Sequence, residues 1–181
     1  MSRILLVIAL TLVPFAVMAS TAGARHRPGS CPGANLRPTR RDLGRIRAAT
    51  LCLVNRERVD RGERALVASA RLQWIAQRHS QSMASGGYFA HVGPRGDTPF
   101  SRIRSVGFLS RPRRVHHVGE NIGWGTLWMA KPRAIVAAWM ASPGHRANIL
   151  DRRFRFTAIG VCPRAPHSRQ RGAIYTQDFG G

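Results

Sequence analysis

The chain has 181 residues, a formal net charge of +21 and a sequence pI near 12.0. That length is one domain's worth and is enough for a substantial hydrophobic core. All but one of the 29 basic residues are arginines, and they are scattered through every segment. This scatter excludes a basic tail or block, so attraction to anionic envelope polymers is expected only as a side effect of a solvated surface.

The N-terminus has the features of a secretory signal peptide. Arg3 supplies a positive start, residues 4–17 are almost wholly apolar, and Ala22-Gly23-Ala24 fits a cleavage site. We predict a signal peptide over residues 1–24 and a secreted or envelope-associated protein. An uncleaved anchor is the open alternative, which Pro14 and the short apolar run disfavour. Once the leader is removed, we expect no membrane span, and export makes nucleic acid an unsuitable partner.

An irregular segment rich in proline and arginine follows over residues 25–41, and the folded domain is predicted over residues 42–181. Three cysteines in an exported chain predict one disulfide and one leftover thiol. We favour a bond between Cys31 and Cys52, which would tie the irregular segment to the first helix. The sequence leaves pairing of Cys52 with Cys162 open.

Apolar spacing predicts four helices in chain order. A capping box from Thr39 to Asp42 is expected to start the first, which runs until Gly62. Helix start and stop signals predict three more, over residues 69–86, 98–107 and 132–142.

The C-terminal third is of β type. Phe156 to Cys162 and Ala173 to Asp178 are short strand-like runs on either side of a polar turn. The glycine-containing stretch after residue 118 is expected to be a loop. Helices flanking a small sheet describe an α+β domain of layered type.

Several loop or helix-end segments combine polar groups with glycine or aromatic neighbours, as functional segments often do. In order, the informative stretches are Leu53-Val54-Asn55-Arg56-Glu57-Arg58, Tyr88-Phe89-Ala90-His91, Val118-Gly119-Glu120-Asn121-Ile122, Trp139-Met140-Ala141-Ser142-Pro143-Gly144-His145-Arg146-Ala147-Asn148-Ile149-Leu150 and Ala158-Ile159-Gly160-Val161. At this order and spacing, the chain resembles the CAP superfamily of cysteine-rich secretory, antigen 5 and pathogenesis-related proteins, also called SCP-like. The resemblance covers about residues 46–179 and is nearest to the short bacterial branch.

The resemblance implies a three-layer α-β-α sandwich with a small central antiparallel sheet and a cleft. Many members hold two histidines and two glutamates in that cleft. His91 and His145 match the histidines and Glu120 matches the first glutamate, but Ser142 stands where the second would fall. The implied cleft is lined by these four residues and Asn121.

Two imidazoles and one carboxylate could form an open site for a divalent metal such as zinc. Catalysis would also require a spare carboxylate as general base, and Ser142 does not supply one. Alternatively, the same groups hold the fold together, with Glu120 accepting hydrogen bonds from both histidines or from Arg146.

Other polar and aromatic residues receive structural interpretations. His79 and Trp139 lie on apolar helix faces and are predicted to be core. Trp124 and Trp128 either floor a groove, where aromatic faces suit sugar or lipid, or simply pack.

The sequence supports three alternative hypotheses for the function of this chain. We favour a secreted, non-enzymatic CAP domain that binds a glycan, lipid or peptide in the cleft. A hydrolase is the second hypothesis, either metal-assisted through His91, Glu120 and His145 or built on Ser142 and His145. The third is an adhesion protein that binds the cell envelope by charge alone.

Overall fold

The computed structural model describes residues 30–109 and 117–181. In chain order the elements are α1 (Leu43–Val59), β1 (Val67–Ala68), α2 (Ala70–Gly86), α3 (Pro99–Ser105), β2 (Val118–Thr126), the 3-10 turn η1 (Leu127–Ala130), α4 (Pro132–Ala141), α5 (Pro143–Leu150), β3 (Phe156–Cys162) and β4 (Gly172–Gly180).

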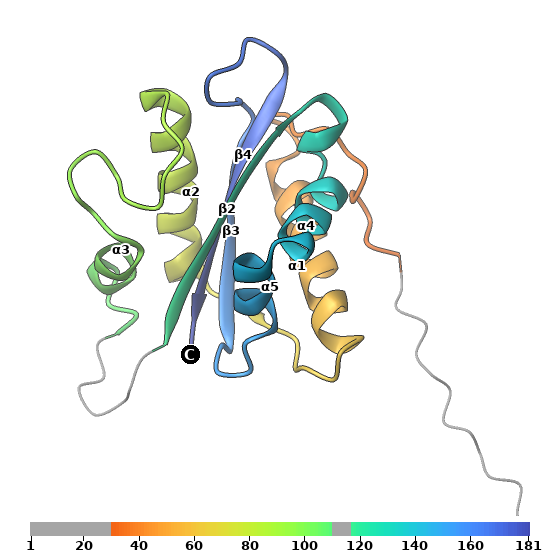
Figure 1. The fold of residues 1–181 in the computed structure, drawn as a ribbon, viewed down its shortest axis with the longest axis vertical. Coiled ribbons are helices and arrows are strands. Elements are labelled where there is room, and N and C mark those ends of the chain that lie inside the picture. The colour runs from red at the N-terminus through yellow and green to blue at the C-terminus, as the bar shows by residue number, and fades with distance from the viewer. Residues whose placement is uncertain (1–29, 110–116) are drawn as a thin grey trace, which may run out of the picture.

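The strands form a single sheet in the order β1-β3-β4-β2. Helices α2 and α3 cover one face of the sheet, and α1, α4 and α5 cover the other (Figure 1). This arrangement confirms the predicted α-β-α sandwich. The sheet is antiparallel except at one edge, where the two-residue strand β1 runs parallel to β3.

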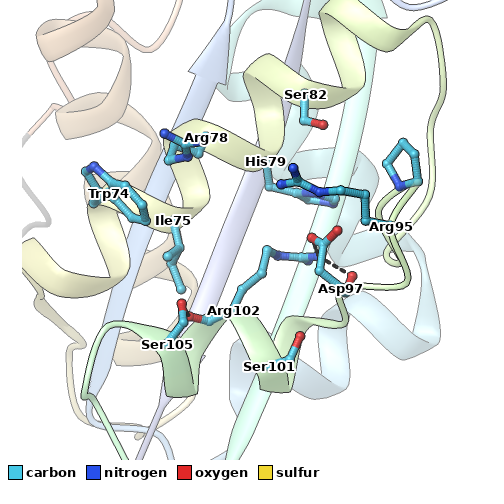
Figure 2. A pocket seen from close by; sticks show the side chains of 11 residues that line it. Trp74, Ile75, Arg78, His79, Ser82, Arg95, Asp97, Ser101, Arg102 and Ser105 are labelled. Carbon is cyan, nitrogen blue, oxygen red and sulfur yellow. Dashed lines mark hydrogen bonds and ion pairs between the residues drawn. The ribbon is translucent and has the colours of Figure 1, made fainter.

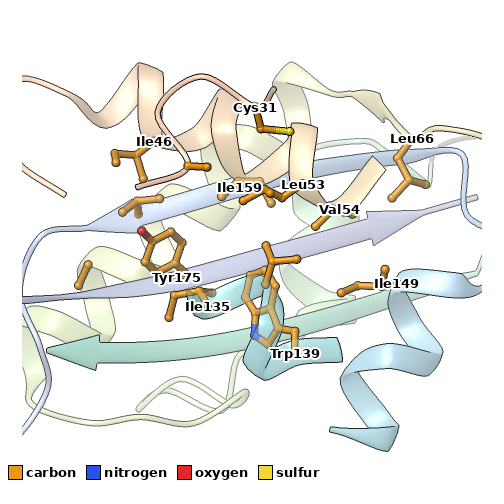
Figure 3. Close-up of a cluster of buried hydrophobic side chains, with 14 of the residues drawn as sticks. Cys31, Ile46, Leu53, Val54, Leu66, Ile135, Trp139, Ile149, Ile159 and Tyr175 are labelled. Carbon is orange, nitrogen blue, oxygen red and sulfur yellow. The ribbon is translucent and has the colours of Figure 1, made fainter. Parts of the chain in front are cut away.

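The larger hydrophobic cluster lies between the sheet and the α1, α4 and α5 layer (Figure 3). Trp139 of α4 and Tyr175 of β4 meet edge-on at its centre, with ring centroids 6.5 Å apart. Both keep a polar partner, since Tyr175 donates to the Ala130 carbonyl at 2.7 Å and Trp139 donates to the Ile122 carbonyl at 3.0 Å. Trp139 is therefore a core residue, as predicted.

Helix α2 lies directly on the backbone of β3. A Cβ atom at Gly160 would overlap the Ala76 carbonyl, so only glycine permits this approach. Gln73 donates to the Ile159 carbonyl at 2.9 Å, and Gln77 exchanges bonds of 2.8 and 3.1 Å with the backbone of Val161. These amides satisfy the part of β3 that extends beyond its short pairing with β1.

The predicted helix starts are borne out except at α1. A capping box joins Thr98 and Ser101 at the start of α3. The prediction of a capping box from Thr39 to Asp42 is wrong. Helix α1 begins after Asp42, whose carboxylate accepts the Thr39 hydroxyl at 2.7 Å and makes no cap to the helix backbone.

The stretch expected to be a loop after residue 118 is strand β2, which pairs along its full length with β4. Its glycines lower strand propensity and hid the pattern. Packing explains these glycines. A Cβ at Gly123 would lie 2.9 Å from Nε1 of Trp139, and one at Gly125 would lie 2.5 Å from the Met129 carbonyl oxygen. The Gly119-Glu120-Asn121 segment is therefore held rigidly in a sheet.

A disulfide joins Cys31 to Cys52, which confirms the favoured pairing. Cys162 is a half-buried thiol in β3, and burial raises its pKa. Within residues 30–109 and 117–181, no helix is long and apolar enough to cross a membrane. The predicted leader lies outside the described residues and stays a prediction.

Candidate functional site

The Glu120 carboxylate is the centre of a buried polar cluster. Its side chain is 1% exposed, and its two oxygens have different partners. Oε1 accepts from Nδ1 of His91 at 2.7 Å, and Oε2 accepts from Nη2 of Arg102 at 2.6 Å. Nε2 of His79 lies 3.9 Å from Oε1. Strand β2, helices α2 and α3 and the loop between those helices therefore meet at one carboxylate.

Arg102 connects this cluster to the loop that carries His91. Besides Glu120, its guanidinium donates to the Asp97 carbonyl at 2.8 Å, the Asp97 carboxylate at 3.1 Å and the His91 carbonyl at 3.0 Å. The capping box of α3 fixes the helix turn from which Arg102 projects. A planar guanidinium suits this role because it presents several donors in fixed directions.

His79 is buried, as predicted for a core residue, and it also faces the site. Its Nε2 bonds to the Ala90 carbonyl at 3.0 Å. Burial is the main cause that lowers the pKa of His79, and the charge of Arg102 adds to it against the opposing effect of Glu120. The neutral imidazole with its proton on Nε2 is the form that suits a carbonyl acceptor.

Asp178 of β4 lies opposite Glu120 in the strand register. It is fully buried, and no N–H or O–H donor among the described residues reaches either carboxylate oxygen. Burial, and then the charge of Glu120, raise the pKa of Asp178 well above its usual value. The protonated acid is therefore favoured, and it can donate to its neighbour Glu120.

Asn121 and Asn148 fasten α5 to β2. Asn121 donates to the His145 carbonyl at 3.1 Å, and Asn148 donates to Oδ1 of Asn121 at 2.9 Å and to the Glu120 carbonyl at 3.3 Å. These bonds give Asn121 a structural task. Because Asn148 ties α5 to the backbone of Glu120, α5 sits beside the cluster.

The predicted cleft residues differ in whether they contact Glu120. His91 contacts Glu120, whereas the half-buried His145 ring makes no hydrogen bond within the described part of the chain. Burial and the nearby charge of His91 lower the pKa of His145, so the two imidazoles interact electrostatically. The Ser142 side chain forms no cap at the α4–α5 junction. Arg102, and not Arg146, is the arginine that meets Glu120.

The arrangement does not fit a divalent metal well. A guanidinium already contacts the one carboxylate that would be a ligand, at 2.6 Å, and a cation would have to displace it. Within the described ranges, no three His, Cys, Asp or Glu side chains are grouped to hold a metal ion. The metal site predicted from His91, Glu120 and His145 thus stays a prediction, which these contacts weigh against.

A cavity of about 640 Å³ lies beside this cluster, between α2 and the loop leading into α3 (Figure 2). It is lined by Trp74, Ile75, Arg78, His79, Ser82, Pro94, Arg95, Asp97, Ser101, Arg102 and Ser105. The guanidinium of Arg78 lies 4.7 Å from the ring centroid of Trp74. None of the five predicted cleft residues lines the cavity, but His79 and Arg102 form both its wall and the surroundings of Glu120.

Sequence reasoning missed Arg102, Asp97 and Asp178. Arg102 is one of many scattered arginines, and only the turn of α3 aims it at Glu120. Asp178 could have been found by pairing β4 with the Gly119-Glu120-Asn121 segment, had that segment been recognised as a strand.

Comparison with known proteins defines the class to which this fold and cluster belong. The profile of the cysteine-rich secretory protein family, CAP, matches residues 51–179. The chain therefore belongs to the CAP family.

Individual relatives agree with this assignment. The Bacillus subtilis protein YkwD is 34% identical over 129 residues, which cover 71% of this chain but only 44% of that protein. This chain thus spans less than half the length of that curated relative. An extracellular SCP-domain protein from Bacillus anthracis has a TM-score of 0.61 at 24% identity, covering 78% of this chain and 43% of its own. An outer surface protein from Borrelia burgdorferi has a TM-score of 0.61 at 16% identity, with 79% and 94% covered.

Proposed function

We propose that this chain is an extracellular, non-catalytic binding protein that holds an anionic saccharide in the cavity between α2 and α3. One observation carries the proposal. Trp74 and Arg78 stand together at the cavity, with Arg95 on the opposite loop and serine hydroxyls between them.

The chemistry of the lining favours an acidic sugar. Arg78 and Arg95 are exposed, and neither has a carboxylate partner among the described residues. Guanidinium groups bind carboxylates and phosphates through paired hydrogen bonds. The half-exposed Trp74 ring offers a flat apolar face to the C–H groups of a sugar. Ser82, Ser101 and Ser105 already form hydrogen bonds within the protein, and their remaining lone pairs can accept from sugar hydroxyls.

The cluster around Glu120 supports binding over catalysis. A general base needs a free lone pair aimed at its substrate. Both Glu120 oxygens are engaged by cationic or N–H donors, and the neighbouring Asp178 favours its protonated form. Within the described residues, the Ser142 hydroxyl and the His145 ring do not form the hydrogen bond that a serine nucleophile would require. We infer that the cluster fixes the inner wall of the cavity.

An extracellular location draws on three lines of support. The predicted leader precedes the domain, and the solved proteins with the same fold include one described as extracellular and one described as an outer surface protein. The disulfide between Cys31 and Cys52 suits an oxidising compartment.

Calorimetric titration of the chain from Arg25 onward tests the proposal, since that chain keeps every described helix and strand. An oligomer of galacturonic acid should bind and the neutral galactose oligomer should not. Replacing Arg78 and Arg95 by glutamine removes both fork-shaped donors and should weaken binding at least about tenfold.

A matched control removes the same charge elsewhere. Arg152→Gln with Arg155→Gln alters two exposed arginines outside the cavity lining and should change affinity by less than about twofold. Equal weakening in both double variants would overturn the cavity and support adhesion by charge alone. Cleavage of the oligomer that Glu120→Gln abolishes would support the hydrolase alternative instead.

A further inference from the structure

The 3-10 turn η1 displays three apolar side chains to solvent. Leu127, Trp128 and Met129 are 44%, 63% and 46% exposed, and we call them the η1 patch. A single exposed apolar residue is ordinary, but a run of large ones indicates an interaction surface.

The backbone of the patch is strained in a way that displays Leu127. Its φ angle is +51°, in the left-handed region that suits glycine or asparagine. A leucine there costs on the order of 1 kcal/mol. The Leu127 amide donates to the Arg171 carbonyl at 2.8 Å, which holds the turn in place. The fold therefore holds a strained residue whose apolar side chain is left partly in water.

The charged residues that line the small cavity beside the patch are both cationic. Arg37 and Arg171, both exposed, line a small cavity together with Leu127. The sequence has no aspartate or glutamate from residue 121 to residue 150, or from residue 152 to residue 177. An apolar projection flanked by two arginines is thus the local chemistry.

This combination favours one occupant over others. A soluble polyanion would satisfy the arginines but would leave the leucine and tryptophan in water. A second copy of the chain would bring arginine against arginine at the same patch. A bilayer with anionic headgroups offers phosphates to Arg37 and Arg171 and an interfacial apolar layer to Leu127 and Trp128. We propose that the η1 patch docks this protein on an anionic phospholipid membrane.

The patch is separate from the cavity proposed for saccharide binding. In Figure 1, η1 follows the far end of β2 on the side of α4, whereas α2 and α3 lie across the sheet. Either site can fail without the other.

Co-sedimentation with lipid vesicles tests the proposal on the chain from Arg25 onward. Vesicles of phosphatidylcholine with about one third phosphatidylglycerol should bind it, and pure phosphatidylcholine should bind far less. Leu127→Asn with Trp128→Ser keeps a residue that accepts the left-handed backbone. It should lower binding at least about tenfold. Arg37→Gln with Arg171→Gln should lower binding about fivefold for each arginine removed.

Matched controls distinguish binding through the η1 patch from nonspecific hydrophobic or electrostatic binding elsewhere on the protein. Phe100→Ser removes an aromatic side chain that is 49% exposed on α3, and Arg152→Gln with Arg155→Gln removes two distant charges. Both should bind vesicles within about twofold of the parent protein. Unchanged binding by the Leu127 and Trp128 variant would overturn the proposal. So would equal binding to neutral and anionic vesicles, or self-association through Trp128 without vesicle binding.

Discussion

Glu120 and Asp178 face each other across β2 and β4, and the protein compensates the two buried acids differently. The Glu120 carboxylate contacts the guanidinium of Arg102 and accepts a hydrogen bond from His91. Asp178 has no cationic partner within hydrogen-bonding distance in the described part of the chain, and its raised pKa favours the neutral acid. One carboxylate is stabilised by a partner and the other by a proton.

Replacing Asp178 by asparagine should raise the melting temperature at pH 7 by a few degrees. The raised pKa means that the folded protein keeps a proton that the unfolded chain loses above about pH 3.9. The contribution of protonated Asp178 to the free energy of unfolding is therefore complete below about pH 3.9, and it is lost as the pH rises through the pKa of the folded protein. The gain should vanish near pH 4, as thermal denaturation at both pH values will show.

Asp60→Asn is the control for this prediction, because Asp60 is exposed at the end of α1. Its melting temperature should match the parent at both pH values. A gain in Asp178→Asn that is the same at pH 4 and pH 7 would assign the effect to packing instead of ionisation.

The contact between His91 and Glu120 could be predicted from the sequence, since the motifs that carry both residues match the family pattern. The rest of the cluster could not. Helical spacing predicts that His79 is buried, but it does not show that the ring faces Glu120. Arg102 and Asp178 are set by a helix turn and a strand register, and neither leaves a local signal.

At the scale of elements, the contact between α2 and β3 decides how closely the two layers approach. Gly160 lets the strand backbone meet the Ala76 carbonyl, and Gln73 and Gln77 complete the contact with hydrogen bonds. Because His79 lies on the same helix, this contact also sets its depth relative to Glu120.

Gly160→Ala should destabilise the domain by about 2 kcal/mol, because a backbone carbonyl cannot rotate away as a flexible side chain can. Urea denaturation measures the loss. Gly144→Ala is the matched control, since a Cβ there meets no atom within 4 Å, and in helix α5 alanine is the better helix former. If both alanine variants unfold at the same urea concentration, the proposed steric contact is wrong.

The helices were more predictable than the strands for a physical reason. Proline at N1 and glycine at the helix ends are local signals, so the starts of α3 and α4 could be predicted. Strand β2 is stabilised by pairing with β4 and by the close approach of Trp139. Its glycines make the strand pattern invisible until those partners are known.

At the scale of the whole molecule, two features act beyond the sheet and its helices. The sequence carries a formal charge of +21, and arginines outnumber acids on nearly every segment. The disulfide links the segment before α1 to the middle of that helix. The three-layer fold itself followed from the ordered motifs, whereas the choice of Cys31 as partner of Cys52 required the structure to decide it.

Replacing Cys31 and Cys52 by serine should lower the free energy of unfolding by about 3 kcal/mol, because the bond closes a loop with a sequence separation of 21 residues. Denaturation of oxidised protein in urea is the measurement. Cys162→Ser should leave the midpoint nearly unchanged. If the double serine variant unfolds at the parent midpoint, the bond contributes nothing in solution.

The same disulfide has a mechanical consequence. A pulling force applied ahead of residue 31 passes through the sulfur bridge to Cys52 and therefore loads α1 at its centre. Residues 32–51 bear none of this force and are not unfolded by it, since they lie inside the covalent loop that the disulfide closes. A protein held at a surface and dragged by flow would then yield only when α1 is pulled off the sheet as a unit.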